Sequence, residues 1–110
     1  MNNPKLAYID YSTAGSLMVL ELWERDLEIA GAESLDDFLT RNDMKDYPVL
    51  LFHPGVNQQH QLRDLPKKFP HLRIAIVTSP TSGGEYLNLG STVFGYNHLD
   101  AIERWVRENQ

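Results

Sequence analysis

The feature that most constrains the fold is the alternation of short apolar runs with segments of helical periodicity. Four apolar runs of strand length cover residues 6–9, 47–52, 72–77 and 93–96, and a fifth strand is indicated by Leu27 and Ile29, which alternate with polar or small residues. Runs this apolar are typical of strands buried on both faces of a parallel sheet, with helices as the connections. The sequence therefore predicts an α/β domain: a flavodoxin-like, doubly wound, five-stranded parallel sheet in the order 2-1-3-4-5, with helices on both faces.

The segments that follow the runs predict the helices. An apolar stripe of Leu17, Leu20 and Trp23 predicts the first helix over residues 14–25. Ser34, followed three residues later by Asp37, resembles a capping box and predicts the start of the second helix. The other three are expected from residue 57 to the prolines at 66 and 70, within residues 81–90, and over residues 99–106.

The composition excludes several classes of protein. The chain has 110 residues, which suits one domain spanning residues 1–110, and it has no cysteine. A disulfide framework, a thiolate metal site and a cysteine nucleophile are therefore excluded. No apolar run approaches the roughly 18 residues of a membrane span, and the N-terminus lacks the pattern of a signal peptide. We therefore expect a cytoplasmic protein that contacts no membrane.

The charge is acidic overall and unevenly placed. The formal net charge is −5, which argues against direct contact with nucleic acid, because such contacts need clustered Lys and Arg. Between Glu21 and Asp46 the chain has nine acidic residues and three basic ones. This segment is interpreted as a solvated helical face, with an interaction surface for a basic partner as the alternative.

The topology itself says which residues share an edge of the sheet. In a doubly wound sheet, ligands bind at the carboxyl ends of the strands. The residues that leave those ends are Asp10, Tyr11, His53, Thr78, Ser79, Asn97 and His98. Asp10 is the one evident carboxylate among them, so neither a Mg²⁺ site nor another metal or cofactor is expected. We also expect no enzymatic activity, and an acid–base pair of Asp10 and His53 is the alternative.

At these positions the chain resembles the receiver domains of response regulators, the phosphoacceptor modules of two-component signalling. The resemblance covers residues 5–108 and lies in the order of the predicted elements and the positions of single residues, not in a sequence motif. Asp10 matches the first residue of the family's acidic pair, and Tyr11 replaces the second. His53 lies at or next to the place of the phosphoaccepting Asp, and Thr78 matches the family's Thr or Ser. Anchoring strand five on Gly90 puts Asn97 at the family's Lys.

Anchoring strand five instead on the last helix puts Gly95 at the position of the Lys, and neither alignment supplies a Lys. The resemblance therefore implies a receiver fold with a vestigial phosphorylation pocket made of Asp10, Tyr11, His53, Thr78 and Asn97. It implies a degenerate receiver, or pseudo-receiver, that regulates a signalling or transcriptional output independently of phosphorylation. One form of such a module is the N-terminal regulatory domain of a longer protein.

The resemblance also implies how such a domain acts. It would bind a protein partner or form a homodimer through its last strand and helix, where Phe94, Tyr96 and Trp105 lie.

A second hypothesis is a sensor of a small anion or nucleotide. The loop from Thr78 to Gly84 is rich in hydroxyl groups and glycine, and its backbone N–H groups could hold an anion. The candidate residues are Ser79, Thr81, Ser82, Gly83 and Gly84. The loop matches neither the Walker pattern nor the dinucleotide pattern, and a loop without a ligand is the alternative.

Overall fold

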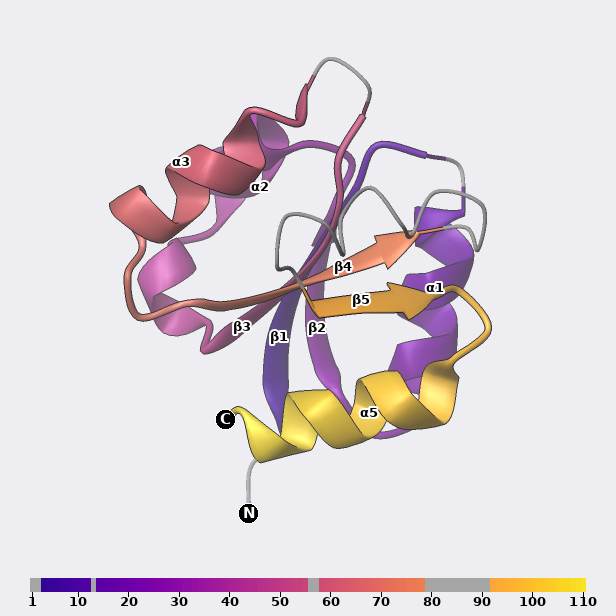
Figure 1. Cartoon of the computed structure of the whole chain (residues 1–110). Coiled ribbons are helices and arrows are strands. Elements are labelled where there is room, and N and C mark those ends of the chain that lie inside the picture. The colour runs from indigo at the N-terminus through magenta and orange to yellow at the C-terminus, as the bar shows by residue number, and fades with distance from the viewer. Residues whose placement is uncertain (1–2, 13, 56–57, 79–91) are drawn as a thin grey trace.

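A single parallel sheet forms the centre of the molecule. The computed structural model describes residues 3–12, 14–55, 58–78 and 92–110. Within these ranges the strands are β1 (Lys5–Asp10), β2 (Glu28–Ala32), β3 (Val49–His53), β4 (Arg73–Thr78) and β5 (Thr92–Gly95). All neighbouring pairs are parallel and the order is β2-β1-β3-β4-β5 (Figure 1). The predicted fold class and strand order are confirmed.

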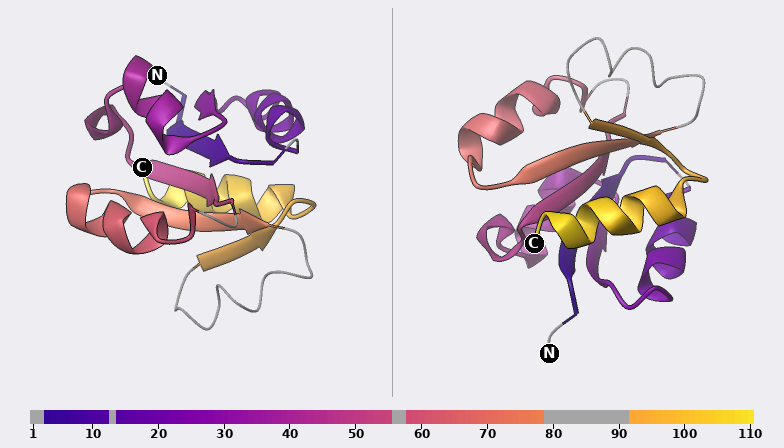
Figure 2. Two further views of the ribbon diagram at one scale, coloured as in Figure 1. Left: turned by 90° about the horizontal axis from the view of Figure 1, so that it is seen from above. Right: turned by 60° about the horizontal axis from the view of Figure 1, so that its bottom comes forward.

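Helices cover both faces of the sheet (Figure 2). Their bounds are α1 (Gly15–Trp23), α2 (Leu35–Arg41), α3 (Gln61–Lys68) and α5 (Leu99–Glu108), with a short 3₁₀ helix, η1 (Met44–Asp46). α1 and α5 pack on one face, and α2, η1 and α3 pack on the other. The helix expected within residues 81–90 lies outside the described residues. No helix among the described residues is long and apolar enough to cross a membrane.

The central strands contribute to two separate cores. On β1, Leu6 and Tyr8 face α1 and α5, whereas Ala7 and Ile9 face α2 and α3. This alternation is the period of two that every strand imposes on its side chains. Because β1 and β3 lie between neighbours and under helices on both faces, their side chains are buried in both directions. That double burial explains the unbroken apolar runs from which the sheet was predicted.

The predicted apolar stripe of α1 is not its buried face. Leu17, Leu20 and Trp23 are 59%, 51% and 69% exposed, whereas Met18 and Leu22 are buried against the sheet. The helix carries two apolar stripes, and the position of Gly15 determines which of them faces the sheet. A Cβ at Gly15 would lie 2.8 Å from the Cβ of Asp10, so the start of the helix lies directly against the end of β1. Gly15, Met18 and Leu22 share one face at helical spacing and turn the other stripe outward.

The structure also tests three predicted helix and strand boundaries. The Ser34 cap is confirmed, because its Oγ accepts a hydrogen bond of 3.1 Å from the backbone N–H of Asp37. α3 continues through Pro66 and ends at Lys68, although Pro66 leaves one helical hydrogen bond unmade. β5 ends at Gly95, so Tyr96 follows the strand and is not part of it.

Candidate functional site

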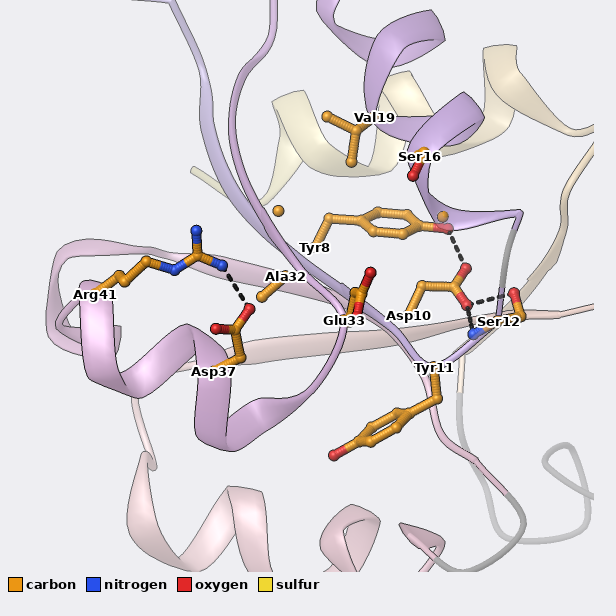
Figure 3. Close-up of a pocket in the computed structure, with 12 residues that line it drawn as sticks. Tyr8, Asp10, Tyr11, Ser12, Ser16, Val19, Ala32, Glu33, Asp37 and Arg41 are labelled. Atoms are coloured by element: carbon orange, nitrogen blue, oxygen red, sulfur yellow. Dashed lines mark hydrogen bonds and ion pairs between the residues drawn. The ribbon is translucent and has the colours of Figure 1, made fainter.

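The Asp10 carboxylate lies at the end of β1 and is 2% exposed. Its Oδ1 accepts hydrogen bonds from the backbone N–H and the hydroxyl of Ser12, the first at 2.7 Å. Its Oδ2 accepts from the hydroxyl of Tyr8 at 2.9 Å and from that of Tyr96 at 3.0 Å. Figure 3 shows the bonds from Tyr8 and Ser12. Since a carboxylate has about four acceptor positions, these four donors occupy all of them.

The elements of the fold bring these donors together from three places. Tyr8 precedes Asp10 by two residues, so both side chains leave the same face of β1. Ser12 belongs to the turn that leads into α1. Tyr96 comes from the loop after β5, 86 residues along the chain. Gly15 allows α1 to lie directly against Asp10.

The charge of Asp10 is balanced by dipoles and not by a cation. Among the residues that the structure describes, no Lys, Arg or His forms an ion pair with it. Burial raises the pKa of Tyr8 above its ordinary value, and the charge of Asp10 and the hydrogen bond to it raise this pKa further. Tyr8 therefore stays protonated, and its hydroxyl donates a hydrogen bond to the carboxylate of Asp10.

His53 lies beside Asp10 in the register of β1 and β3 but interacts with β4. Its Nδ1 is 2.9 Å from the carbonyl oxygen of Val77, and since a carbonyl only accepts, Nδ1 carries a proton. The half-buried imidazole lies 5.7 Å from the ring of Tyr96, centroid to centroid. Asp10 and His53, both within the described residues, share no hydrogen bond in this structure.

Tyr11 points away from Asp10 (Figure 3). Its ring packs against Phe52, with centroids 6.3 Å apart, on the side of the sheet that α2 and α3 cover. Its hydroxyl donates to Oε1 of Gln61 and accepts from the backbone N–H of Leu35, both at 3.2 Å. Tyr11 therefore ties the start of α2 to α3, and the strand alternation explains why Tyr8, not Tyr11, contacts Asp10.

Thr78 and Asn97, the other two residues assigned to the vestigial pocket, differ in burial. Thr78 is 1% exposed, and its hydroxyl has no hydrogen-bond partner in the structure as described. It pairs in register with Gly95, whereas Asn97 is exposed in the turn beyond β5. Ser79, Thr81, Ser82, Gly83 and Gly84 lie outside the described residues.

The residues assigned to the interaction face are half-buried. The rings of Phe94 and Trp105 meet edge to face, with centroids 6.0 Å apart, and both pack against the core under α1 and α5. Tyr96 is occupied by its hydrogen bond to Asp10. The large apolar side chains most exposed among the described residues are instead those of α1.

Similarity to known proteins is found by comparing structures and not by comparing sequences. No protein-family model matches the sequence, and no curated protein is similar to it in sequence. A response regulator from Thermotoga maritima superimposes with a TM-score of 0.71 and 16% identity, over 96% of each chain. A response regulator receiver domain protein from Clostridium thermocellum gives 0.72 and 15%, over 96% of this chain and 92% of that one. The chain has the receiver-domain fold.

A third similar structure is described as an adenylate cyclase from Rhodopirellula baltica. Its TM-score is 0.68 and its identity 15%, over 97% of this chain and 87% of that one. Identities this low show a common fold, and the chemistry of this chain has to be argued from its own residues. The expected resemblance to receiver domains is confirmed at the level of the fold.

The donor set does not fit the Mg²⁺ that a receiver fold implies. Mg²⁺ is bound in proteins through carboxylate oxygens and water, and both Asp10 oxygens already accept two hydrogen bonds each. Tyr11 points away from the site, and a basic side chain, His53, occupies the end of β3. Among the described residues, no group of three or more His, Asp or Glu side chains is placed to hold a metal ion.

Sequence reasoning missed the two tyrosines that contact Asp10. Tyr8 carried a usable signal, because a residue two positions before Asp10 on the same strand must share its face. Tyr96 carried none, because its contact with Asp10 depends on β5 ending at Gly95 and on the position of the following turn.

Proposed function

We propose that this chain is a receiver-like signalling domain that does not depend on phosphorylation of an aspartate and acts by binding another protein. The observation that supports it is the carboxylate of Asp10, held by four uncharged donors. Each hydrogen bond to a charged group contributes about 1.5–3 kcal/mol, so a metal ion could bind these oxygens only by displacing several of them. At the end of β3, the imidazole of His53 cannot form an acyl phosphate.

Phosphoryl chemistry can be tested directly on the intact chain. The protein is incubated with acetyl phosphate and Mg²⁺ and its mass is measured, and a second sample receives beryllofluoride and Mg²⁺ for two-dimensional NMR. We expect no added phosphoryl group and no shift changes centred on Asp10. A receiver domain with the full acidic set serves as the positive control. Phosphoryl addition to this chain, or shifts at Asp10, would contradict the proposal.

The surface for the partner is proposed to be α1. Leu17, Leu20 and Trp23 form a stripe of exposed apolar side chains, and exposed apolar patches commonly mark binding sites. The last strand and helix, as the face of a homodimer, are the alternative. The half-burial of Phe94 and Trp105 makes that face the weaker candidate.

Sedimentation velocity over a range of concentrations separates these two surfaces. Leu20→Glu changes α1, and Ala101→Arg changes the exposed side of α5. If the wild-type chain forms dimers, dissociation by Leu20→Glu alone supports α1, and dissociation by Ala101→Arg alone supports the last helix. A wild-type chain that stays monomeric at every concentration excludes the homodimer and leaves a different protein as the partner.

An anion or nucleotide sensor at the loop that follows Thr78 is the second candidate function. The observation in its favour is the buried Thr78 hydroxyl, which has no partner among the described residues. A buried unsatisfied polar group costs about 1–3 kcal/mol, and an anion could accept its hydrogen bond. Thermal-shift assays against nucleotides and phosphate test this function. Stabilisation that Gly83→Val abolishes would support it, and the absence of any stabilisation would exclude it.

A further inference from the structure

A cavity of about 770 Å³ opens at the carboxyl ends of β1 and β2, between α1 and α2. Figure 3 shows Val19 and Ser16 of α1 on one side of this space, with Glu33 and the pair of Asp37 and Arg41 on the other. Its volume lies within the range of small-molecule sites, about 300–1,000 Å³.

The cavity exists because β2 ends in two small residues. Gly31 and Ala32 place no large side chain between the two helices. A Cβ at Gly31 would lie 3.0 Å from a methyl group of Val19, so a larger residue there would have to displace Val19. The space is therefore set by the identity of Gly31 and can be closed by a single substitution.

The charges around the cavity are unbalanced. Arg41 is its one basic side chain, and it is bound to Asp37, four residues earlier on α2. The negative charges of Asp10 and Glu33 are therefore not balanced by a basic side chain of the cavity lining. All acceptor positions of Asp10 are occupied, so it contributes its field but no further hydrogen bond. The carboxylate of Glu33 and the hydroxyl of Ser16 have no hydrogen-bond partner in the part of the chain that the structure describes.

We propose that this cavity binds a small organic cation, a protonated aliphatic amine whose ammonium group donates to Glu33. Glu33 supplies a free charged acceptor, Ser16 a free hydroxyl, and Asp10 a second negative charge behind them. The methyl groups of Val19 and the side chain of Ala32 provide an apolar wall for the methylene groups of the ligand. An organic amine fits better than a metal ion, because the described residues contain no cluster of three metal-ligating side chains. The inference does not rest on the proposed function.

The test is an NMR titration of the full chain at fixed ionic strength. The probe is 1,4-diaminobutane, and its neutral isostere 1,4-butanediol is the control ligand. We expect saturable shift changes at residues 15–19 and 31–33 with the diamine and none with the diol. A hydrogen bond to a charged group contributes about 1.5–3 kcal/mol, so Glu33→Gln should weaken binding by about tenfold to a hundredfold.

Two further variants keep the test specific. Glu28→Gln removes an exposed carboxylate of β2 that does not line the cavity, and it should leave the affinity unchanged. Gly31→Val narrows the cavity and should abolish binding, while the three carboxylates that line the cavity, Asp10, Glu33 and Asp37, remain. No saturable binding, equal binding of the diol, or the same loss in Glu28→Gln and Glu33→Gln would each overturn the proposal.

Discussion

Tyr96 donates its hydroxyl to Oδ2 of Asp10 at 3.0 Å and thereby joins the loop after β5 to the end of β1. β1 and β5 are separated in the sheet by β3 and β4, so this bond crosses the carboxyl edge of the sheet. Together with Tyr8 it occupies one oxygen of the carboxylate completely. The carboxylate at the end of β1 is thus held within a closed hydrogen-bond network.

Removing this hydroxyl should measurably destabilise the domain. Tyr96→Phe deletes one hydrogen bond to a buried charge, with an expected loss of about 1.5–3 kcal/mol in the free energy of unfolding. The measurement is urea denaturation. Tyr47→Phe is the matched control, because the Tyr47 hydroxyl donates to the neutral amide oxygen of Asn42 at 3.3 Å. A loss for Tyr96→Phe no larger than for the control would contradict the role given to this bond.

The raised pKa of Tyr8 predicts a loss of stability at alkaline pH. An ordinary tyrosine titrates near pH 10, whereas burial first and Asp10 second keep Tyr8 protonated above that value in the folded chain. The unfolded chain therefore releases this proton at a lower pH than the folded chain. The contribution of Tyr8 to stability is complete below about pH 10 and decreases as the pH rises further.

Unfolding by urea at a series of pH values from neutral to alkaline checks this prediction. Tyr8→Phe should lower the stability at neutral pH and flatten its decline above about pH 10. Tyr47→Phe, which removes a tyrosine hydroxyl that bonds to the amide of Asn42, is the matched control. Parallel pH profiles for wild type and Tyr8→Phe would show that Tyr8 does not titrate as described.

The sheet could be predicted from sequence because burial on both faces leaves a local signal. Val49, Leu50, Leu51 and Phe52 are consecutive and fully buried, and such a run has few other interpretations. The Ser34 cap was predictable for the same reason, since both of its partners lie within four residues. Local patterns therefore predicted the strands of the described residues and one helix start.

The site and the rotation of α1 depend on contacts between distant parts of the chain. Leu17 and Leu20 have the same helical spacing and apolar character as an inward-facing stripe, so periodicity cannot separate them from Met18 and Leu22. The contact of Gly15 with Asp10 decides the rotation, and it exists only once the helix lies on the sheet. The bond from Tyr96 to Asp10 depends in the same way on the register of β5 with β4.

The contact of Gly15 with Asp10 leads to a prediction of its own. In an exposed helix position, replacing Gly with Ala stabilises by about 1 kcal/mol. At Gly15 the new Cβ would lie 2.8 Å from the Cβ of Asp10, and the backbone of α1 would have to move. We expect Gly15→Ala to destabilise by about 1–3 kcal/mol. Ser16→Ala, at the next and exposed position, should change stability by less than about 0.5 kcal/mol. Stabilisation by Gly15→Ala would refute the close approach.

The rotation of α1 is tested by two leucines two residues apart. Leu22 is fully buried and Leu20 is 51% exposed, so the same substitution to Ala removes the same atoms from two different surroundings. Leu22→Ala should cost about 2–5 kcal/mol, because it leaves a cavity against the sheet. Leu20→Ala should change the free energy of unfolding by less than about 0.5 kcal/mol, because it removes exposed surface. Thermal and urea unfolding of the two variants, side by side, give the comparison. Equal losses, or a larger loss for Leu20→Ala, would mean that the stripe of Leu17, Leu20 and Trp23 faces the core, and α1 would then no longer be a candidate surface for a partner.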